Sequence, residues 1–135
     1  MSAFQKFNCF VGDIGLGLHN LDTDVIKVYL TNTAPVAGNT VYNTPADLAT
    51  SGGYTAGGID AQCAYAQSGG IGSLTGVDIV FTATTGFGPF RYAVLYNNTS
   101  STKPLIGFWD YGSGVTLGAL ETFTVDFGST ILTLQ

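Results

Sequence analysis

The chain has 135 residues, which is enough for one domain that buries roughly 65 to 70% of the surface of its unfolded form. Only 10% of the residues are charged, the net charge is −5, and the four basic residues are scattered: Lys6, Lys27, Arg91 and Lys103. Nucleic-acid binding needs clustered cations and a membrane-spanning helix needs roughly 20 apolar residues in a row, so we expect neither nucleic-acid nor membrane partners.

The weakly charged, Gly-rich composition suits a protein whose surface is covered by neighbours in an assembly. The alternative is a β protein that is merely rich in glycine. Residues 1–8 lack an apolar signal core, which predicts that the chain is made in a cytoplasm and stays there until it is released. Cys9 and Cys63 could form a disulfide, but free thiols are more typical of a chain that is not secreted.

Residues 1–22 are predicted to form one short helix followed by a turn. Apolar residues recur every three or four positions and would share one side of the helix: Phe4, Phe7, Val11, Ile14 and Leu18. Three glycines weaken this helix, because each interior Gly costs about 1 kcal/mol relative to Ala. A nucleotide-binding reading of Gly15-Leu16-Gly17 fails, since no strand precedes it.

The polar break that follows holds the only histidine, His19, for which we expect a solvated or capping role. Asp22 and Asp24 resemble the start of a calcium loop, but the Gly and the bidentate Glu that should follow are missing. A calcium ion here would need ligands from distant loops. We therefore expect no metal and no cofactor.

A β-branched run at residues 24–31 predicts a strand, and residues 32–76 then form a long, loop-rich excursion. Within it we expect a short strand at 41–42, a helical turn at 45–49, a strand at 61–66 and a flexible stretch at 68–73. A loop of this length in a compact domain is usually functional or ordered by a partner.

Residues 77–135 carry the clearest strand patterns, at 77–83, 90–96, 105–111, 122–127 and 131–134. The strand at 90–96 is apolar on both faces and reads as central, and it forms a hairpin with 105–111 through a polar tip. The strand at 122–127 alternates apolar and polar residues, which favours antiparallel pairing. The fold class predicted for the single domain 1–135 is mainly β: an antiparallel β-sandwich or jelly-roll-like domain with one short N-terminal helix.

No residue pattern identifies a catalytic site, and we expect the chain not to be an enzyme. Asp110, Glu121 and Asp126 are candidates for paired carboxylates, and burial of Asp110 in its aromatic strand would raise its pKa as a general acid requires. An Asp bonded to a neighbouring backbone amide is the commoner case. Four aromatic residues suggest either a sugar-stacking platform or, more simply, core packing: Tyr92, Tyr96, Trp109 and Tyr111.

An ordered set of segments carries a family resemblance: FQKFN (residues 4–8), HNL (19–21), KVYLTNTAPV (27–36), GYTAGG (53–58), GPFRYAVLYN (88–97), KPLIG (103–107), WDYGS (109–113) and ETFTVDF (121–127). Together they resemble a family of short structural proteins of tailed bacteriophages and prophages. The resemblance spans most of the chain, although no single segment is a catalytic motif.

The resemblance implies a virion structural protein, and first among such roles a capsid decoration (cement) protein on the capsid exterior. Its partners would then be the major capsid protein and other copies of itself, with a trimer favoured. The alternatives are a tail or head-to-tail joining component, or a carbohydrate-binding virion module. We expect the sandwich to be the rigid body, with residues 32–76 and the N-terminal segment reaching neighbours and Tyr42, Tyr54 and Tyr65 as interface anchors. The competing hypothesis is that these tyrosines fill the protein's own core.

Overall fold

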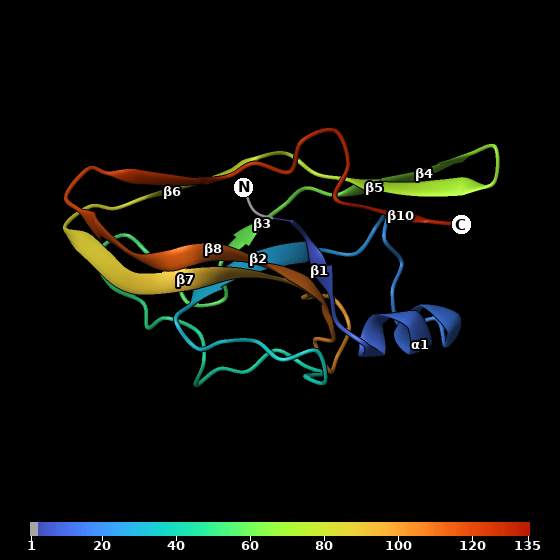
Figure 1. Cartoon of the computed structure of the whole chain (residues 1–135), viewed down its shortest axis with the longest axis horizontal. Coiled ribbons are helices and arrows are strands. Elements are labelled where there is room, and N and C mark those ends of the chain that lie inside the picture. The colour runs from blue at the N-terminus through green and yellow to red at the C-terminus, as the bar shows by residue number, and fades with distance from the viewer. Residues whose placement is uncertain (1–2) are drawn as a thin grey trace.

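The computed structural model describes residues 3–135, whose strands lie in two stacked layers (Figure 1). One layer is a five-stranded sheet, in the order β1 (Gln5–Lys6), β8 (Leu105–Gly118), β7 (Gly86–Asn97), β2 (Ile26–Thr31) and β3 (Ile59–Asp60). The facing layer holds two smaller sheets placed end to end: β6 (Ile79–Thr82) with β9 (Thr122–Val125), and β10 (Leu132–Leu134), β5 (Ile71–Thr75) and β4 (Ala64–Ser68).

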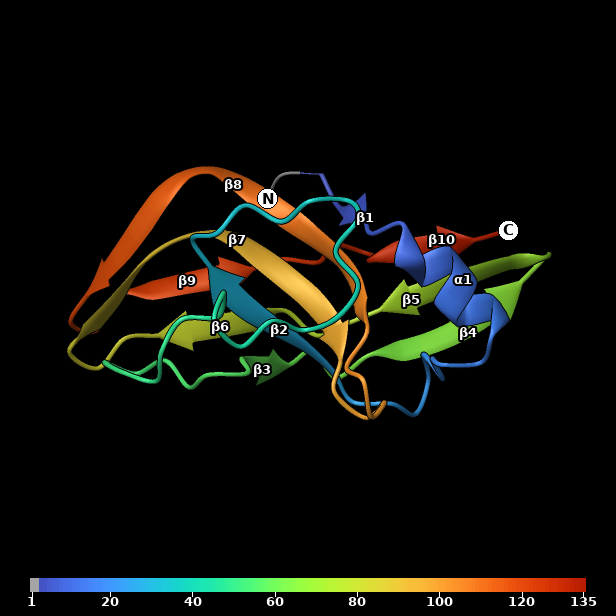
Figure 2. The ribbon, with the colours of Figure 1, turned by 90° about the horizontal axis from the view of Figure 1, so that it is seen from below.

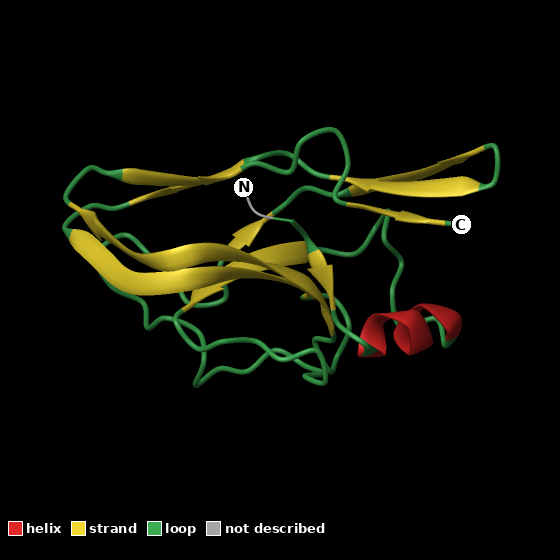
Figure 3. Cartoon of the chain, in the orientation of Figure 1, coloured by secondary structure: helices red, strands yellow, loops and turns green. Residues whose placement is uncertain are grey.

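All strand pairs are antiparallel, and α1 (Cys9–Gly15), the single helix of the described residues, lies at one end of the molecule (Figure 3). Strands hold 47% of the chain and helix 5%, and the layers form a β-sandwich-like fold. The predicted fold class, mainly β and antiparallel with one short helix, is confirmed.

Strand β7 is the central strand of the five-stranded sheet, because it pairs with β2 on one side and β8 on the other. Successive side chains of a strand point to opposite faces. Ala93 and Leu95 accordingly belong to the core between the two layers, while Val94 and Tyr96 belong to a second cluster on the opposite face. Both faces are thus covered, as the two-sided apolar pattern of this strand predicts.

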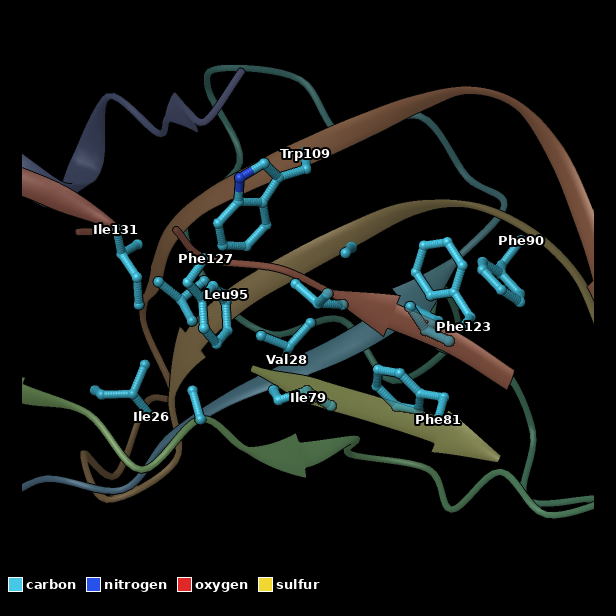
Figure 4. Packing of buried hydrophobic residues seen from close by; sticks show 14 of the residues in the cluster. Ile26, Val28, Ile79, Phe81, Phe90, Leu95, Trp109, Phe123, Phe127 and Ile131 are labelled. Atoms are coloured by element: carbon cyan, nitrogen blue, oxygen red, sulfur yellow. The ribbon is translucent and has the colours of Figure 1, made fainter. Parts of the chain in front are cut away.

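The core between the layers is rich in aromatic rings (Figure 4). Phe123 of β9 meets Phe90 of β7 with ring centroids 4.9 Å apart, and Phe127 packs against Trp109 at 5.6 Å. Burying side chains of this size stabilises the fold by roughly 1.5 to 3 kcal/mol each. Aromatic residues of β9 and of the segment just after it therefore fasten the β6–β9 sheet to the five-stranded sheet.

The N-terminal helix is shorter than predicted. It begins at Cys9, since residues 5 and 6 pair with the edge of β8 at Phe108 and Gly107 and form strand β1 instead. Phe10 is the helical residue that is fully buried, whereas Val11 is 60% exposed. The spacing from Phe4 to Leu18 arises from a strand and a helix in succession, so it does not mark one helical face.

Strands occupy the stretch expected to be flexible, and β8 extends beyond the strand predicted at 105–111. The stretch at 68–73, expected to be flexible, contains the end of β4, the hairpin turn and the beginning of β5. Gly69 and Gly70 both adopt positive φ and allow a tight turn. The expected strand at 61–66 begins only at Ala64, and β8 continues through Gly112 and Gly114 to Gly118. In β5 and in the second half of β8, glycines have a low strand propensity, and pairing with a neighbouring strand keeps these residues extended.

Candidate interaction surface

The segment 32–58, which we name the covering loop, crosses the face of the five-stranded sheet opposite the smaller sheets (Figure 2). Its backbone is tied to the rest of the chain at several points. Leu105 N–H donates to the carbonyl of Thr40 at 3.0 Å, and Tyr42 N–H donates to the carbonyl of Lys103 at 2.8 Å. Hydrogen bonds within the chain thus hold this loop, whereas the sequence analysis expects a loop of this length to be either functional or ordered by a partner.

The carboxylate of Asp47 joins the middle of the covering loop to its C-terminal part. The Tyr42 hydroxyl donates to its Oδ2 at 2.5 Å, the Gly57 N–H donates to the same oxygen at 2.6 Å, and the Tyr54 hydroxyl donates to Oδ1. Such charge-assisted bonds are roughly twice as strong as neutral ones. The sequence analysis does not single out Asp47 as a site residue, although it is the only charged residue between Lys27 and Asp60.

Tyr54 fills the protein's own core, so it is not available as an interface anchor. Its side chain is 2% exposed, lies near Phe81 and Phe87, and its hydroxyl accepts a hydrogen bond from the N–H of Leu30 at 3.0 Å. Tyr42 is half-buried and stacks on Tyr96 with ring centroids 4.8 Å apart. Its main contacts are therefore also within the chain.

Four tyrosines are influenced by the charge of Asp47: Tyr29 and Tyr96 of the sheet, and Tyr42 and Tyr54 of the covering loop. Burial, together with the nearby carboxylate of Asp47, raises the pKa of Tyr29, Tyr42 and Tyr54 well above the usual value of 10.0. The pKa of Tyr96 rises to about 12 for the same two reasons. Their hydroxyls stay protonated at neutral pH, and those of Tyr42, Tyr54 and Tyr96 act as hydrogen-bond donors in the structure.

Tyr65, the third expected anchor, lies on the β4–β5 hairpin. Its ring lies across Gly72 of β5, where an added Cβ would come within 1.7 Å of the Tyr65 hydroxyl oxygen. It also lines a cleft of about 470 Å³ between α1 and the β10-β5-β4 sheet, together with Ile14, His19 and Leu134. Tyr65 is half-buried and is not placed next to Tyr42 or Tyr54, which the sequence hypothesis grouped with it.

The β4–β5 hairpin reaches beyond the end of the five-stranded sheet, with α1 beneath it (Figures 1 and 2). Four of the five residues of β4 are exposed, and Ile71 at the start of β5 is 42% exposed. No charged residue occurs from Ala61 to Val77. The hairpin therefore presents a neutral, partly apolar projection.

The covering loop offers a second surface of the same kind. Val36 is 58% and Val41 is 43% exposed, and the chain carries no charge from residue 28 to residue 46. A cavity of about 420 Å³ lies between this part of the loop and the sheet, with Tyr29 in its lining. The sequence signal that could have indicated these two surfaces is an isolated valine or isoleucine within an uncharged, polar stretch.

The candidate carboxylates are engaged in local structure. Asp110 accepts two hydrogen bonds from the Arg91 guanidinium, at 2.8 and 3.1 Å, and one from the N–H of Gly112. The Arg91 bonds, with that backbone bond, hold the pKa of Asp110 below its usual range. The upward shift that a general acid requires is absent, because the carboxyl is near solvent and paired with a cation; the bond from a neighbouring backbone amide, which the sequence analysis gives as the commoner case, is present. Glu121 and Asp126 each accept a turn N–H, from Gly118 and Gly128.

The four aromatic residues considered as a sugar platform do not share a face. Trp109 is buried in the core between the layers, and Tyr96 is buried in the cluster under the covering loop. Tyr111 is 50% exposed and contacts Phe123 by its edge. Core packing is thus the role of Trp109 and Tyr96.

The two cysteines are free thiols, as the sequence analysis favours. Burial, with a contribution from Asp60, raises the pKa of Cys63 to about 12, so its nucleophilic thiolate is scarce at neutral pH. Within residues 3–135, no group of three or more His, Cys, Asp or Glu side chains is arranged to hold a metal ion. No helix in this range has the length and apolar character to cross a membrane.

The chain matches no protein-family model, no curated protein and no solved structure. Its surface chemistry and its fold are therefore the basis for assigning a role.

Proposed function

We propose that this chain is a non-enzymatic bacteriophage virion protein, a capsid decoration (cement) protein that binds the outer surface of the head shell and stabilises it. The observation that carries the proposal is the uncharged β4–β5 hairpin, which extends from a rigid sandwich and exposes Ile71. A self-sufficient core joined to a neutral, projecting edge suits adhesion to other subunits. The family resemblance of the sequence supports the same role.

The energetics of a shell make modest contacts sufficient. A decoration protein meets many identical sites, and a symmetric cluster of copies engages several of them at once. Each contact is then strengthened by the others without further area. We propose that the partners are the major capsid protein and two further copies of this chain, forming a trimer, with no nucleic acid or membrane involved.

The hairpin contact is tested by placing a charge on it. Ile71→Asp should lower the number of copies on purified particles at least tenfold, because a buried, unpaired carboxylate at an interface is costly. The melting temperature of the isolated protein should stay unchanged, since Ile71 is already partly exposed. The measurement is gel densitometry of particles reconstituted with the variant.

The matched control is Val80→Asp. Val80 is 51% exposed on β6, at the other end of the smaller-sheet layer, so the same charge is added at similar exposure. This variant should decorate particles like the unmodified protein. Equal loss in both variants, or loss in neither, would remove the hairpin as the capsid contact.

Copy number separates the proposed role from a tail or head-to-tail joining component. A copy number per particle that matches the repeated sites of the shell indicates decoration, whereas a copy number that fills only a single ring indicates a joining component. Binding or cleavage of host polysaccharide by the purified protein would instead favour a carbohydrate-binding module, and Tyr111 is the exposed ring with which such binding would begin.

A further inference from the structure

The amide of Asn97, at the end of β7, is a fully buried polar group with four hydrogen bonds. Its Oδ1 accepts from the N–H groups of Thr99 and Ser100, at 2.9 and 3.1 Å. Its Nδ2 donates to Asp24 Oδ2 at 2.7 Å and lies 3.0 Å from His19 Nδ1. The two backbone donors fix which end of the amide is oxygen, so the group that faces His19 is the NH₂.

This orientation determines the proton position on His19. Because Nδ1 accepts a hydrogen bond from Asn97, it carries no proton, and the neutral ring holds its proton on Nε2. Nε2 is buried and has no hydrogen-bond partner within residues 3–135. The ring also packs on Phe10 of α1, with centroids 5.3 Å apart.

His19 thus lies between two parts of the chain. Residues 16–25, which we name the strap, connect α1 to β2, and His19 and Asp24 attach the strap to the end of β7. Through Phe10 the same ring contacts the helix. We propose that His19 is a pH-sensitive latch: the neutral ring holds the strap against the end of β7 and α1 against the strap, and protonation of Nδ1 releases both.

Protonation of Nδ1 would release the latch because two hydrogen-bond donors, the Nδ1–H of His19 and the NH₂ of Asn97, would then face each other. A proton on Nδ1 would point at the NH₂ of Asn97, which cannot turn its oxygen toward the ring without losing the bonds from Thr99 and Ser100. A buried donor left unpaired costs about 1 to 3 kcal/mol. The charged imidazolium must therefore rotate out of its place, and the contact with Phe10 loosens with it.

Several charged or titratable groups surround the ring. Asp13 on α1 and Asp24 on the strap favour the charged form, while burial opposes it more strongly, so the pKa of His19 is lowered from 6.5. Asp22 of the strap and Tyr65 of β4 line the same cleft. The unfolded chain then binds the proton more readily than the folded one, and the latch weakens as the pH falls below 6.5.

The test uses the fact that the chain has one histidine. In protein labelled with ¹⁵N at histidine, NMR at about pH 7.5 should show the proton on Nε2, and the titration midpoint should lie below 6.5. Hydrogen exchange of the α1 amides, corrected for its intrinsic pH dependence, should show at least threefold lower protection at about pH 5 than at about pH 7.5. In His19→Gln, which does not titrate, this difference should vanish.

A second variant keeps the test decisive if His19→Gln does not fold. Asp13→Asn removes a carboxylate that favours the charged ring, so the midpoint should move to still lower pH. A proton on Nδ1 at about pH 7.5, a midpoint at or above 6.5, or α1 protection that is equal at both pH values would overturn the latch.

Discussion

At the scale of single residues, Asp47 shows how one charge organises a neutral segment. Three donors from the middle and the C-terminal part of the covering loop converge on its carboxylate, and two of them are tyrosine hydroxyls from the predicted set of anchors. The loop therefore holds its shape without a neighbour. The exposed valines of the loop are displayed on a fixed surface as a result.

We expect Asp47→Asn to lower the free energy of unfolding by about 2 kcal/mol, because the amide is uncharged and directs its NH₂ at one of the donors. Tyr42→Phe removes only one of the three bonds and should cost about 1 kcal/mol. Urea unfolding followed by fluorescence measures both. An Asp47→Asn protein as stable as the unmodified one would show that the carboxylate does not hold the loop.

Gly58 allows the closest approach between the covering loop and the sheet. It adopts a φ of +80°, and an added Cβ would lie 1.7 Å from the carbonyl oxygen of Val28. Gly57 has a φ of +97°, but there the nearest atom to an added Cβ is the Tyr96 hydroxyl at 3.6 Å. The two neighbours thus share the backbone constraint and differ in the available space.

Comparing Gly58→Ala with Gly57→Ala separates these two effects. Gly57→Ala should lower the free energy of unfolding by about 1 to 2 kcal/mol through the left-handed conformation alone. Gly58→Ala must also move β2 or the loop, so we expect at least about 2 kcal/mol more. Equal losses by urea unfolding would mean that the backbone shifts freely at Gly58.

At the scale of elements, strand β1 is held mainly by side-chain packing. Only two residues pair with β8, but Phe4 covers Gly107 and meets Trp109 by its edge, with ring centroids 5.1 Å apart. A Cβ on Gly107 would lie 2.1 Å from Cζ of Phe4. The missing side chain at Gly107 is thus what admits the N-terminal strand.

Gly107→Ala should displace Phe4 and expose Trp109, the single tryptophan of the chain. We expect its emission to shift to the red, and its quenching by acrylamide to increase. Gly114→Ala in the same strand is the control, because nothing lies within 4 Å of its added Cβ. Unchanged Trp109 emission in the first variant would show that β1 adapts without leaving the sheet.

The elements that sequence reasoning found are those whose pattern is local. The apolar residues Phe123 and Val125 alternate with polar ones, which indicates a strand with one covered face. The strand at 90–96 is apolar at successive positions, which indicates that both of its faces are covered. Strand β5 and the second half of β8 contain glycines, and their order comes from pairing: β5 pairs with β4 and with the distant β10, and β8 pairs with β7. Such pairing leaves no periodic signal.

The candidate surface was predicted only in part for a similar reason. The loop-rich excursion does contain the exposed neutral surfaces, but Tyr54 has a buried role that its chemistry does not reveal. A tyrosine suits a core or an interface equally well. The hydrogen bonds from Tyr54 to Asp47 and from Leu30 to Tyr54, which decide between them, require the folded chain.

At the scale of the whole molecule, the five-stranded sheet is covered on one face by the smaller sheets and on the other by the covering loop. The smaller sheets pack on one face through a phenylalanine-rich core that also holds Tyr54. The covering loop lies over the other face, where its Tyr42 packs on Tyr29 and Tyr96 of the sheet. Phenylalanine packing does not respond to pH, whereas a buried tyrosine must stay protonated. The tyrosines around Asp47, and not the phenylalanines, should therefore make the fold sensitive to alkali.

The free energy of unfolding should accordingly fall as the pH rises above 10. The pKa of Tyr29, Tyr42 and Tyr54 is raised in the fold and that of Tyr96 reaches about 12, so the unfolded chain loses protons that the folded chain keeps. This stability is fully present below pH 10 and declines above it. Urea unfolding at about pH 8 and about pH 11, followed by Trp109 fluorescence, measures the decline. If tyrosinate absorbance of these residues develops near pH 10 while the fluorescence stays native and stability is constant, the loop does not seal its tyrosines from solvent.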